Sequence, residues 1–276
     1  MFVLRTPAEV RKTLADLPRP VGLVATLGAL HAGHLALVER ARAECATVVA
    51  TIFVNPLQFG PNEDFDRYPR TFESDAAAFE AAGVDLLYAP AVETMYPPDF
   101  GTSIDAGPVA AGYEGALRPG HFRGVATVCV KLFSTVGAER AYFGQKDAQQ
   151  VAVLRRVVAD LNLPVELVVL PTVREADGLA LSSRNVYLDP EQRAVAPTLH
   201  RALSTIADAV RAGESREQAV ALGRTLLVPP AREAYLDVVD RDRFVPAESA
   251  RHTLAVGSVW LGTTRLIDNE PIEGGA

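Results

Sequence analysis

The chain has 276 residues, of which 49% are hydrophobic and 22% charged, the balance of a folded protein with one large or two modest domains. Its formal net charge of -7 argues against general attraction to nucleic acid or an anionic membrane, so a phosphate ligand must be held locally. There is no apolar run of about 20 residues, and Cys45 and Cys129 lack metal-type spacing, so composition predicts a soluble, cytoplasmic protein.

The first 170 residues alternate short, β-branched apolar runs with longer segments of helical periodicity. This alternation is typical of βαβ units and predicts an α/β protein with a parallel sheet. The predicted strands span residues 21–26, 47–54, 84–89, 141–144 and 165–173. The predicted helices, 34–45 and 149–161, carry apolar stripes of Leu35, Val38, Ala41 and Cys45, and of Val153, Val157 and Leu161.

The pattern changes after Pro171, where a polar loop over 174–185 precedes helical segments between about 190 and 227. Short strands follow, including 234–239 and 254–261. We therefore expect two domains, 1–172 and 173–276, the second a smaller α+β lid.

The first candidate site is residues 26–34 (TLGALHAGH), which follow a predicted strand and open a predicted helix. His31 and His34 are three residues apart and share a helix face, beside unpaired backbone N–H groups and the positive end of the helix dipole. Gly28 and Gly33 permit close approach of backbone and ligand, so the segment predicts a phosphate site. The alternative is that both histidines only cap or pack the helix.

The second candidate is Gly144-Gln-Lys-Asp147, again between a strand and a helix. Only three of the 27 basic residues are lysines, which draws attention to Lys146. Lys146 can neutralise charge on a phosphoryl group in transfer, and Asp147 can accept hydrogen bonds from ribose hydroxyls or help to hold Mg²⁺. The alternative is a solvated Lys–Asp pair at a helix start.

Two further groups of polar residues fit a small anionic substrate. Hydroxyl and guanidinium groups in Leu181-Ser-Ser-Arg184 can clamp phosphate oxygens, although the run also suits an ordinary turn and helix cap. Gln58, close behind Asn55 at a strand end, and Gln150 offer amides that hold a carboxylate without a cation that would weaken it as a nucleophile. Alone, Gln58 also fits a polar loop.

Together these segments resemble the pantothenate synthetases, a family of the nucleotidyltransferase-like Rossmann superfamily that shares H-x-G-H with class I aminoacyl-tRNA synthetases. The resemblance covers most of the first 190 residues, in family order. It departs at Ala25 and Leu27, where the family usually has Pro and Met, and at Gln145, where Glu is common. The matching blocks are residues 26–34, 52–59, 68–70, 118–122, 143–150 and 171–188.

The resemblance implies a Rossmann-like sheet and the conversion of pantoate, ATP and β-alanine to pantothenate through pantoyl adenylate, with Mg²⁺, in a cytoplasmic homodimer. It implies His34 as proton donor, with His31 and Lys146 as further catalytic residues, and Gln58, Gln150 and Asn55 as substrate contacts. Metal ligands remain unassigned. The implied ATP contacts are Leu27, Gly28, Ala29, Leu30, His31, Ala32, Gly33, His34, Gly144, Gln145, Lys146, Asp147, Val173, Leu181, Ser182, Ser183 and Arg184.

Three other functions fit the sequence less well. A nucleotidyltransferase with a stable adenylylated product has no need of a two-glutamine acid pocket. A class I tRNA synthetase requires a K-M-S-K-S string and an anticodon domain, which the sequence lacks. A nucleotide sensor needs ATP contacts but not His34, Lys146 and both glutamines together.

Overall fold

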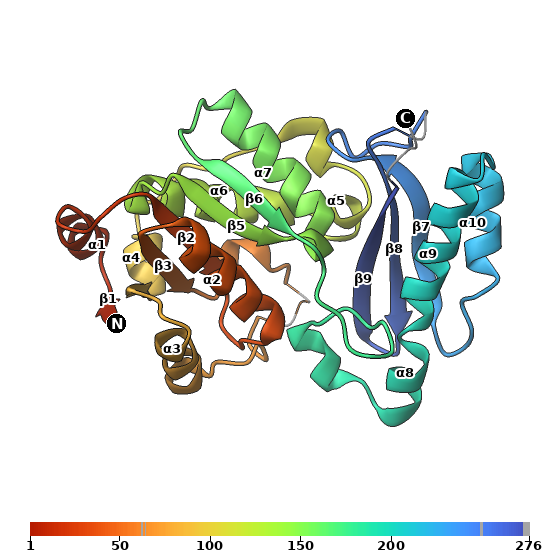
Figure 1. The fold of residues 1–276 in the computed structure, drawn as a ribbon, viewed down its shortest axis with the longest axis horizontal. Helices are drawn as coiled ribbons and strands as arrows, with labels where there is room; N and C mark the ends of the chain where they lie inside the picture. The colour runs from red at the N-terminus through yellow and green to blue at the C-terminus, as the bar shows by residue number, and fades with distance from the viewer. Residues whose placement is uncertain (62, 64, 249–250, 273–276) are drawn as a thin grey trace. The chain divides into compact units, whose positions relative to one another are not determined.

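Six parallel strands form the central sheet of the first part of the chain (Figure 1). The computed structural model describes residues 1–61, 63, 65–248 and 251–272. These divide into unit 1, residues 1–144 and 153–170, and unit 2, residues 145–152 and 171–276. The sheet belongs to unit 1, in the order β1-β4-β3-β2-β5-β6. Its strands are β1 (Phe2–Leu4), β2 (Val21–Thr26), β3 (Thr47–Ile52), β4 (Leu86–Tyr88), β5 (Arg140–Gly144) and β6 (Glu166–Leu170).

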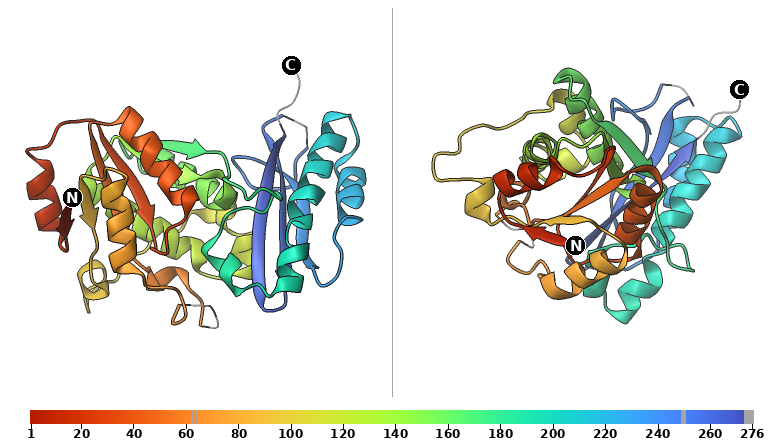
Figure 2. Two further views of the ribbon diagram at one scale, coloured as in Figure 1. Left: turned by 60° about the horizontal axis from the view of Figure 1, so that its bottom comes forward. Right: turned by 60° about the vertical axis from the view of Figure 1, so that its left-hand side comes forward.

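Helices cover both faces of this sheet (Figure 2). On one face, buried residues of α2 and α3 pack on Val24, Ala50 and Tyr142. The largely buried helix α6 contacts β2 and also packs against α1. The helices that begin in unit 1 are α1 (Pro7–Leu14), α2 (Ala32–Glu44), α3 (Phe72–Ala81), α4 (Val92–Met95), α5 (Glu114–Leu117) and α6 (His121–Val136), with 3₁₀ turns η1 (Pro56–Gln58) and η2 (Gly107–Ala110).

Strand order reverses between β2 and β5, which pair with each other in the middle of the sheet. From β2 the chain proceeds outward to β3 and β4, whereas from β5 it proceeds in the opposite direction to β6. Val24 is opposite Tyr142, so Thr26 and Gly144 end neighbouring strands at the same edge. The two predicted nucleotide segments leave the sheet from these ends, the position at which doubly wound folds bind ligands.

The ends of two strands and the buried faces of two helices differ from those predicted from the sequence. Strand β6 ends at Leu170 rather than at 173, since Pro171 has no N–H to donate to a ladder. Strand β3 ends at Ile52 rather than at 54, before the Asn55 turn. Leu161 lies beyond the end of α7 (Ala148–Asp160) and is exposed, and Leu37 is more buried in α2 than Leu35.

Unit 2 contains a three-stranded antiparallel sheet of β7 (Arg232–Asp240), β8 (Thr253–Leu261) and β9 (Thr264–Ile272), with β8 in the centre. Apolar residues of α9 and α10, including Leu203, Ile206 and Val220, pack on Val238 and Ala255 of the sheet. The first residues of α7 also belong to unit 2, with the helices α8 (Pro190–Val195), α9 (Thr198–Arg211) and α10 (Arg216–Arg224) and the 3₁₀ turns η3 (Gln145–Asp147) and η4 (Ser183–Tyr187). The predicted class, a parallel α/β sheet with a smaller α+β part, is confirmed.

Across the described part of the chain, none of the helices has both the length and the apolar character needed to cross a membrane.

Candidate active site

The two histidines of H-x-G-H form the first turn of α2. His31 is the N-cap residue and its Nδ1 accepts a hydrogen bond from the Gly33 backbone N–H at 3.1 Å. The Nδ1 of His34 accepts from the His31 backbone N–H at 3.3 Å, and the two rings stack with centroids 4.1 Å apart. The histidines therefore do cap the helix, and the capping bonds hold both rings at its positive end.

These bonds also determine where a proton resides on each ring. A nitrogen that accepts a hydrogen bond carries no proton, so each neutral ring is protonated on Nε2. The ring N–H that each neutral histidine can donate is therefore the one on Nε2. Gly33 is needed for this arrangement, because a Cβ there would lie 2.9 Å from Cε1 of His31.

A buried carboxylate that sequence reasoning missed holds the loop before α2. Asp75, 4% exposed, accepts hydrogen bonds from the backbone N–H groups of Ala29 at 2.9 Å and Leu30 at 3.0 Å, and from the Thr71 hydroxyl at 3.0 Å. Gly28 has a φ of 87°, and a Cβ on it would lie 3.0 Å from Oδ2 of Asp75. Gly28 thus permits both the left-handed turn and the close carboxylate.

Gln58 ends the 3₁₀ turn η1 and is oriented by Asn55. The Asn55 side chain, which is fully buried, donates to Oε1 of Gln58 at 3.0 Å and to the Gly124 carbonyl at 3.1 Å. Its Oδ1 accepts from the Leu57 N–H at 3.2 Å and the Tyr96 hydroxyl at 2.7 Å. All four hydrogen-bonding positions of the Asn55 amide are thereby occupied within the protein.

The segment behind Gln58 is anchored by the block at 118–122. His121 donates from Nδ1 to the Gln58 carbonyl at 2.8 Å and accepts from Arg118 on Nε2. Arg118 also forms a paired bridge to Glu63, with bonds of 2.6 and 2.7 Å. Burial acts to raise the pKa of Glu63, but the hydrogen bonds and charge of Arg118, together with the Gly60 N–H and His121, outweigh it, and the pKa lies below its ordinary value.

In unit 2, Gln145, Lys146 and Asp147 form η3, directly before α7. Lys146 Nζ lies 3.8 Å from the Asp147 carboxylate, a loose pair, and the Lys146 side chain is 20% exposed. Gln150 is half-buried in the first turn of α7. The carbonyls of Gln145 and Lys146 both accept from Asn269, which had no predicted role.

The loop containing the remaining predicted ATP contacts is also in unit 2. The Leu181 N–H donates to the Val173 carbonyl at 3.0 Å, and Ser182 Oγ caps η4 by accepting from the Arg184 N–H at 3.2 Å. Together these bonds place Val173 next to Leu181 and direct the start of η4.

Parallel strands with a histidine-capped helix after β2 define a doubly wound α/β protein of the nucleotide-binding kind. Residues 2–271 match the family model described as pantoate-beta-alanine ligase, and the chain belongs to this family. It is 55% identical to the pantothenate synthetase of Roseiflexus sp., over 99% of this chain and 100% of that protein. It is also 55% identical to the pantothenate synthetase of Thermus thermophilus, over 96% and 98% of the two chains.

Solved structures similar to this chain come from the same family. The crystal structure of pantothenate synthetase from Thermus thermophilus superposes with a TM-score of 0.94 at 51% identity, covering 99% of this chain and 100% of that one. Pantoate-beta-alanine ligase from Francisella tularensis, complexed with beta-gamma ATP and beta-alanine, has a TM-score of 0.82 at 29% identity, covering 100% and 99%. The predicted family and enzyme class, a pantoate–β-alanine ligase, are confirmed.

Proposed function

We propose that this chain condenses pantoate with β-alanine through pantoyl adenylate, releasing pyrophosphate and then AMP. ATP-dependent formation of pantothenate is the reaction of its family, and the Francisella relative is complexed with beta-gamma ATP and beta-alanine. The observation that carries the proposal for this chain is the stacked His31–His34 pair at the start of α2, behind a loop fixed by Asp75.

A carboxylate resists attack by an amine because the leaving group would be oxide. ATP converts the pantoate carboxylate into a mixed anhydride, from which the amine of β-alanine displaces AMP. The first step is transfer at the α-phosphate, where catalysis consists of positioning and charge stabilisation. His34 donates a proton or hydrogen bond from Nε2 as pyrophosphate leaves, His31 binds phosphate beside it, and Lys146 stabilises the transferring group.

Pantoate is held by the amides of Gln58 and Gln150, which bind a carboxylate without the ground-state charge pairing that would weaken its nucleophilicity. Gln58 also borders β-alanine in this proposal. Asn55 contributes by orienting Gln58, since its own amide is occupied. Leu27 provides an apolar wall for the methyl groups of pantoate.

The proposed ATP contacts are residues 27–34, 144–147, 173 and 181–184. Among residues 1–61, 63, 65–248 and 251–272, no three His, Cys, Asp or Glu side chains are grouped to hold a metal ion. Mg²⁺ usually binds through substrate phosphates, waters and one or two carboxylates, so it belongs here to the MgATP substrate, and Asp147 fits as a single ligand.

We assign domains 1–172 and 173–276, the second acting as a lid, in a cytoplasmic homodimer that assembles through the N-terminal domain. Sedimentation equilibrium tests the dimer, since a monomer mass at all concentrations would refute it.

ATP–pyrophosphate exchange tests the adenylate step. Exchange should require pantoate but not β-alanine, because the adenylate forms before the amine enters. Exchange without pantoate, or no exchange with it, would refute the proposal. AMP release should then require β-alanine.

Lys146→Ala tests the role of the lysine, with Lys12→Ala as the control because Lys12 is exposed on α1. A charge directed at the transition state affects the rate more than binding, so kcat for exchange should fall by roughly 10²–10³-fold while ATP still binds. Lys12→Ala should keep the parent rate. A change in Lys146→Ala confined to the KM for ATP would remove this role.

A further inference from the structure

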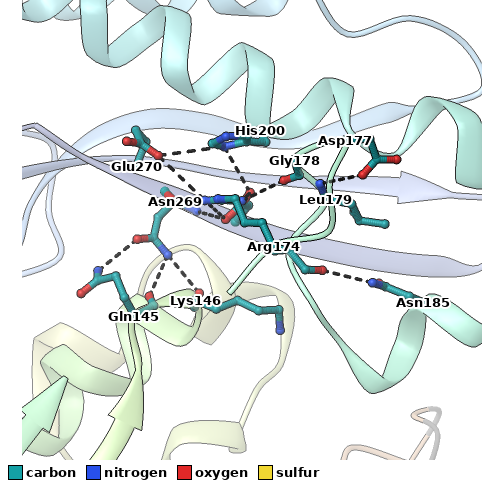
Figure 3. A network of polar contacts seen from close by, with 12 residues as sticks. Gln145, Lys146, Arg174, Asp177, Gly178, Leu179, Asn185, His200, Asn269 and Glu270 are labelled. Carbon is teal, nitrogen blue, oxygen red and sulfur yellow. Dashed lines mark hydrogen bonds and ion pairs between the residues drawn. The ribbon is translucent and has the colours of Figure 1, made fainter. Parts of the chain in front are cut away.

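The carboxamide of Asn269 clamps the backbone that carries Lys146 (Figure 3). Its Nδ2 donates one hydrogen bond to the Gln145 carbonyl at 2.8 Å and one to the Lys146 carbonyl at 3.0 Å. Its Oδ1 accepts from Nε2 of Gln145 at 3.0 Å. Asn269 is 2% exposed and Gln145 6%, so water cannot readily replace these bonds.

The amide orientation of Asn269 follows from its partners. Two carbonyl oxygens accept hydrogen bonds only from the NH₂ group, so Oδ1 must face Gln145 Nε2. Both amide hydrogens are used on consecutive carbonyls of η3. This fixes the direction of the turn from which the Lys146 side chain extends.

Strand β9 is itself held on the other side by ion pairs. Successive residues of a strand point to opposite faces, so Asp268 and Glu270 face away from Asn269. The Asp268 carboxylate, with its side chain 4% exposed, accepts from Arg174 at 2.6 and 3.1 Å. Arg174 also donates to the Asn269 carbonyl at 3.3 Å, and Glu270 lies 3.8 Å from its guanidinium. Asn269 therefore reaches η3 from a rigidly held strand segment.

We propose that Asn269 is a positioning residue for adenylate formation, acting through Lys146 by holding η3 in place. The inference depends on the proposed role of Lys146 in the reaction. Asn269 touches the backbone of Lys146 rather than its ammonium group. It therefore acts on where that charge is placed and not on whether it is present. A displacement of about 1 Å is enough to reduce catalysis by about 10²-fold.

The test is pantoate-dependent ATP–pyrophosphate exchange by the full chain and its variants. Asn269→Ala removes all three side-chain bonds, and kcat should fall by roughly 10- to 100-fold with the KM values for ATP and pantoate little changed. Asn269→Asp retains the volume but sets a carboxylate against two carbonyl oxygens, so it should lose at least as much. It serves as the second variant if the alanine variant does not fold.

A double-mutant cycle separates positioning from general stability. If Asn269 acts through Lys146, adding Asn269→Ala to Lys146→Ala should cost less than about threefold more. Asp237→Asn is the control: it weakens the Arg216–Asp237 pair on β7 of the same sheet and should lower Tm while leaving kcat unchanged.

The kcat for exchange of each Asn269 variant relative to its parent tests the role of Asn269. Exchange by the unmodified chain tests the proposed function. Parent kcat in either folded Asn269 variant would overturn the proposal. A full additional 10- to 100-fold loss in the Lys146→Ala background would overturn it as well.

Discussion

Gly124 of α6 lies against the backbone of η1, and replacing it with alanine should displace Gln58. A Cβ on Gly124 would lie 2.2 Å from the Leu57 oxygen, 2.3 Å from the Leu57 carbonyl carbon and 2.6 Å from the Gln58 nitrogen. Ordinary contact begins at 3.4 Å, so the nearest pair must separate by 3.4 − 2.2 = 1.2 Å. The atoms are backbone, so no side-chain rotation can relieve the clash.

The turn should move rather than the helix. Helix α6 is buried along most of its length, whereas Leu57 in η1 is exposed. Movement of η1 lengthens the bond between Asn55 and the Gly124 carbonyl and changes the position of the Gln58 amide. A shift of about 1 Å at a positioning residue costs about 10²-fold in rate, and overpacking costs about 1–3 kcal/mol of stability.

The assay is pantoate-dependent exchange at varied pantoate, with thermal unfolding measured in parallel. Gly124→Ala should lose kcat/KM for pantoate by about 10²-fold, while the KM for ATP changes little. Gly101→Ala is the matched control, since a Cβ there meets no atom within 4 Å. A Gly124→Ala enzyme with parent kcat/KM for pantoate would show that the position of η1 does not determine pantoate binding.

Two further predictions concern Asp75, which is buried, and His200, which is half-buried. Asp75→Asn replaces an acceptor oxygen with NH₂, so one N–H of the Ala29–Leu30 loop loses its partner. The free energy of unfolding should fall by about 1–3 kcal/mol and the KM for ATP should rise. An unchanged KM would contradict the role of Asp75 in holding the loop. Burial and the Arg174 charge lower the pKa of His200 below 6.5, although Asp268 and Glu270 act to raise it. The unfolded chain therefore binds the proton more readily, and the stability contributed by neutral His200 is complete above pH 6.5 and is lost as pH falls below it. His200→Gln should flatten the fall in Tm between about pH 8 and about pH 5, and an identical pH profile in both proteins would refute this.

Local features of the sequence were sufficient to predict the main helices and strands and part of the candidate site. Strand β2 spans the predicted residues 21–26, because six consecutive small or apolar residues suit a strand buried on both faces. His31 and His34 begin α2 together, since a three-residue spacing alone places them on one face. The ends of β3 and β6 were predicted two or three residues too far along the chain, because apolar residues continue beyond the last hydrogen bond between strands.

The supporting contacts were decided by tertiary structure. Asp75 reaches Ala29 across 46 positions, Asn55 reaches Gly124 across 69, and Asn269 reaches Gln145 across 124. Nothing near Asp75 or Asn269 in the sequence distinguishes it from an ordinary polar residue of a helix or strand. Periodicity reports which face of an element is apolar, which is a property of neighbouring residues. The partner of a buried polar side chain depends instead on strand order and helix packing, which only the folded chain establishes.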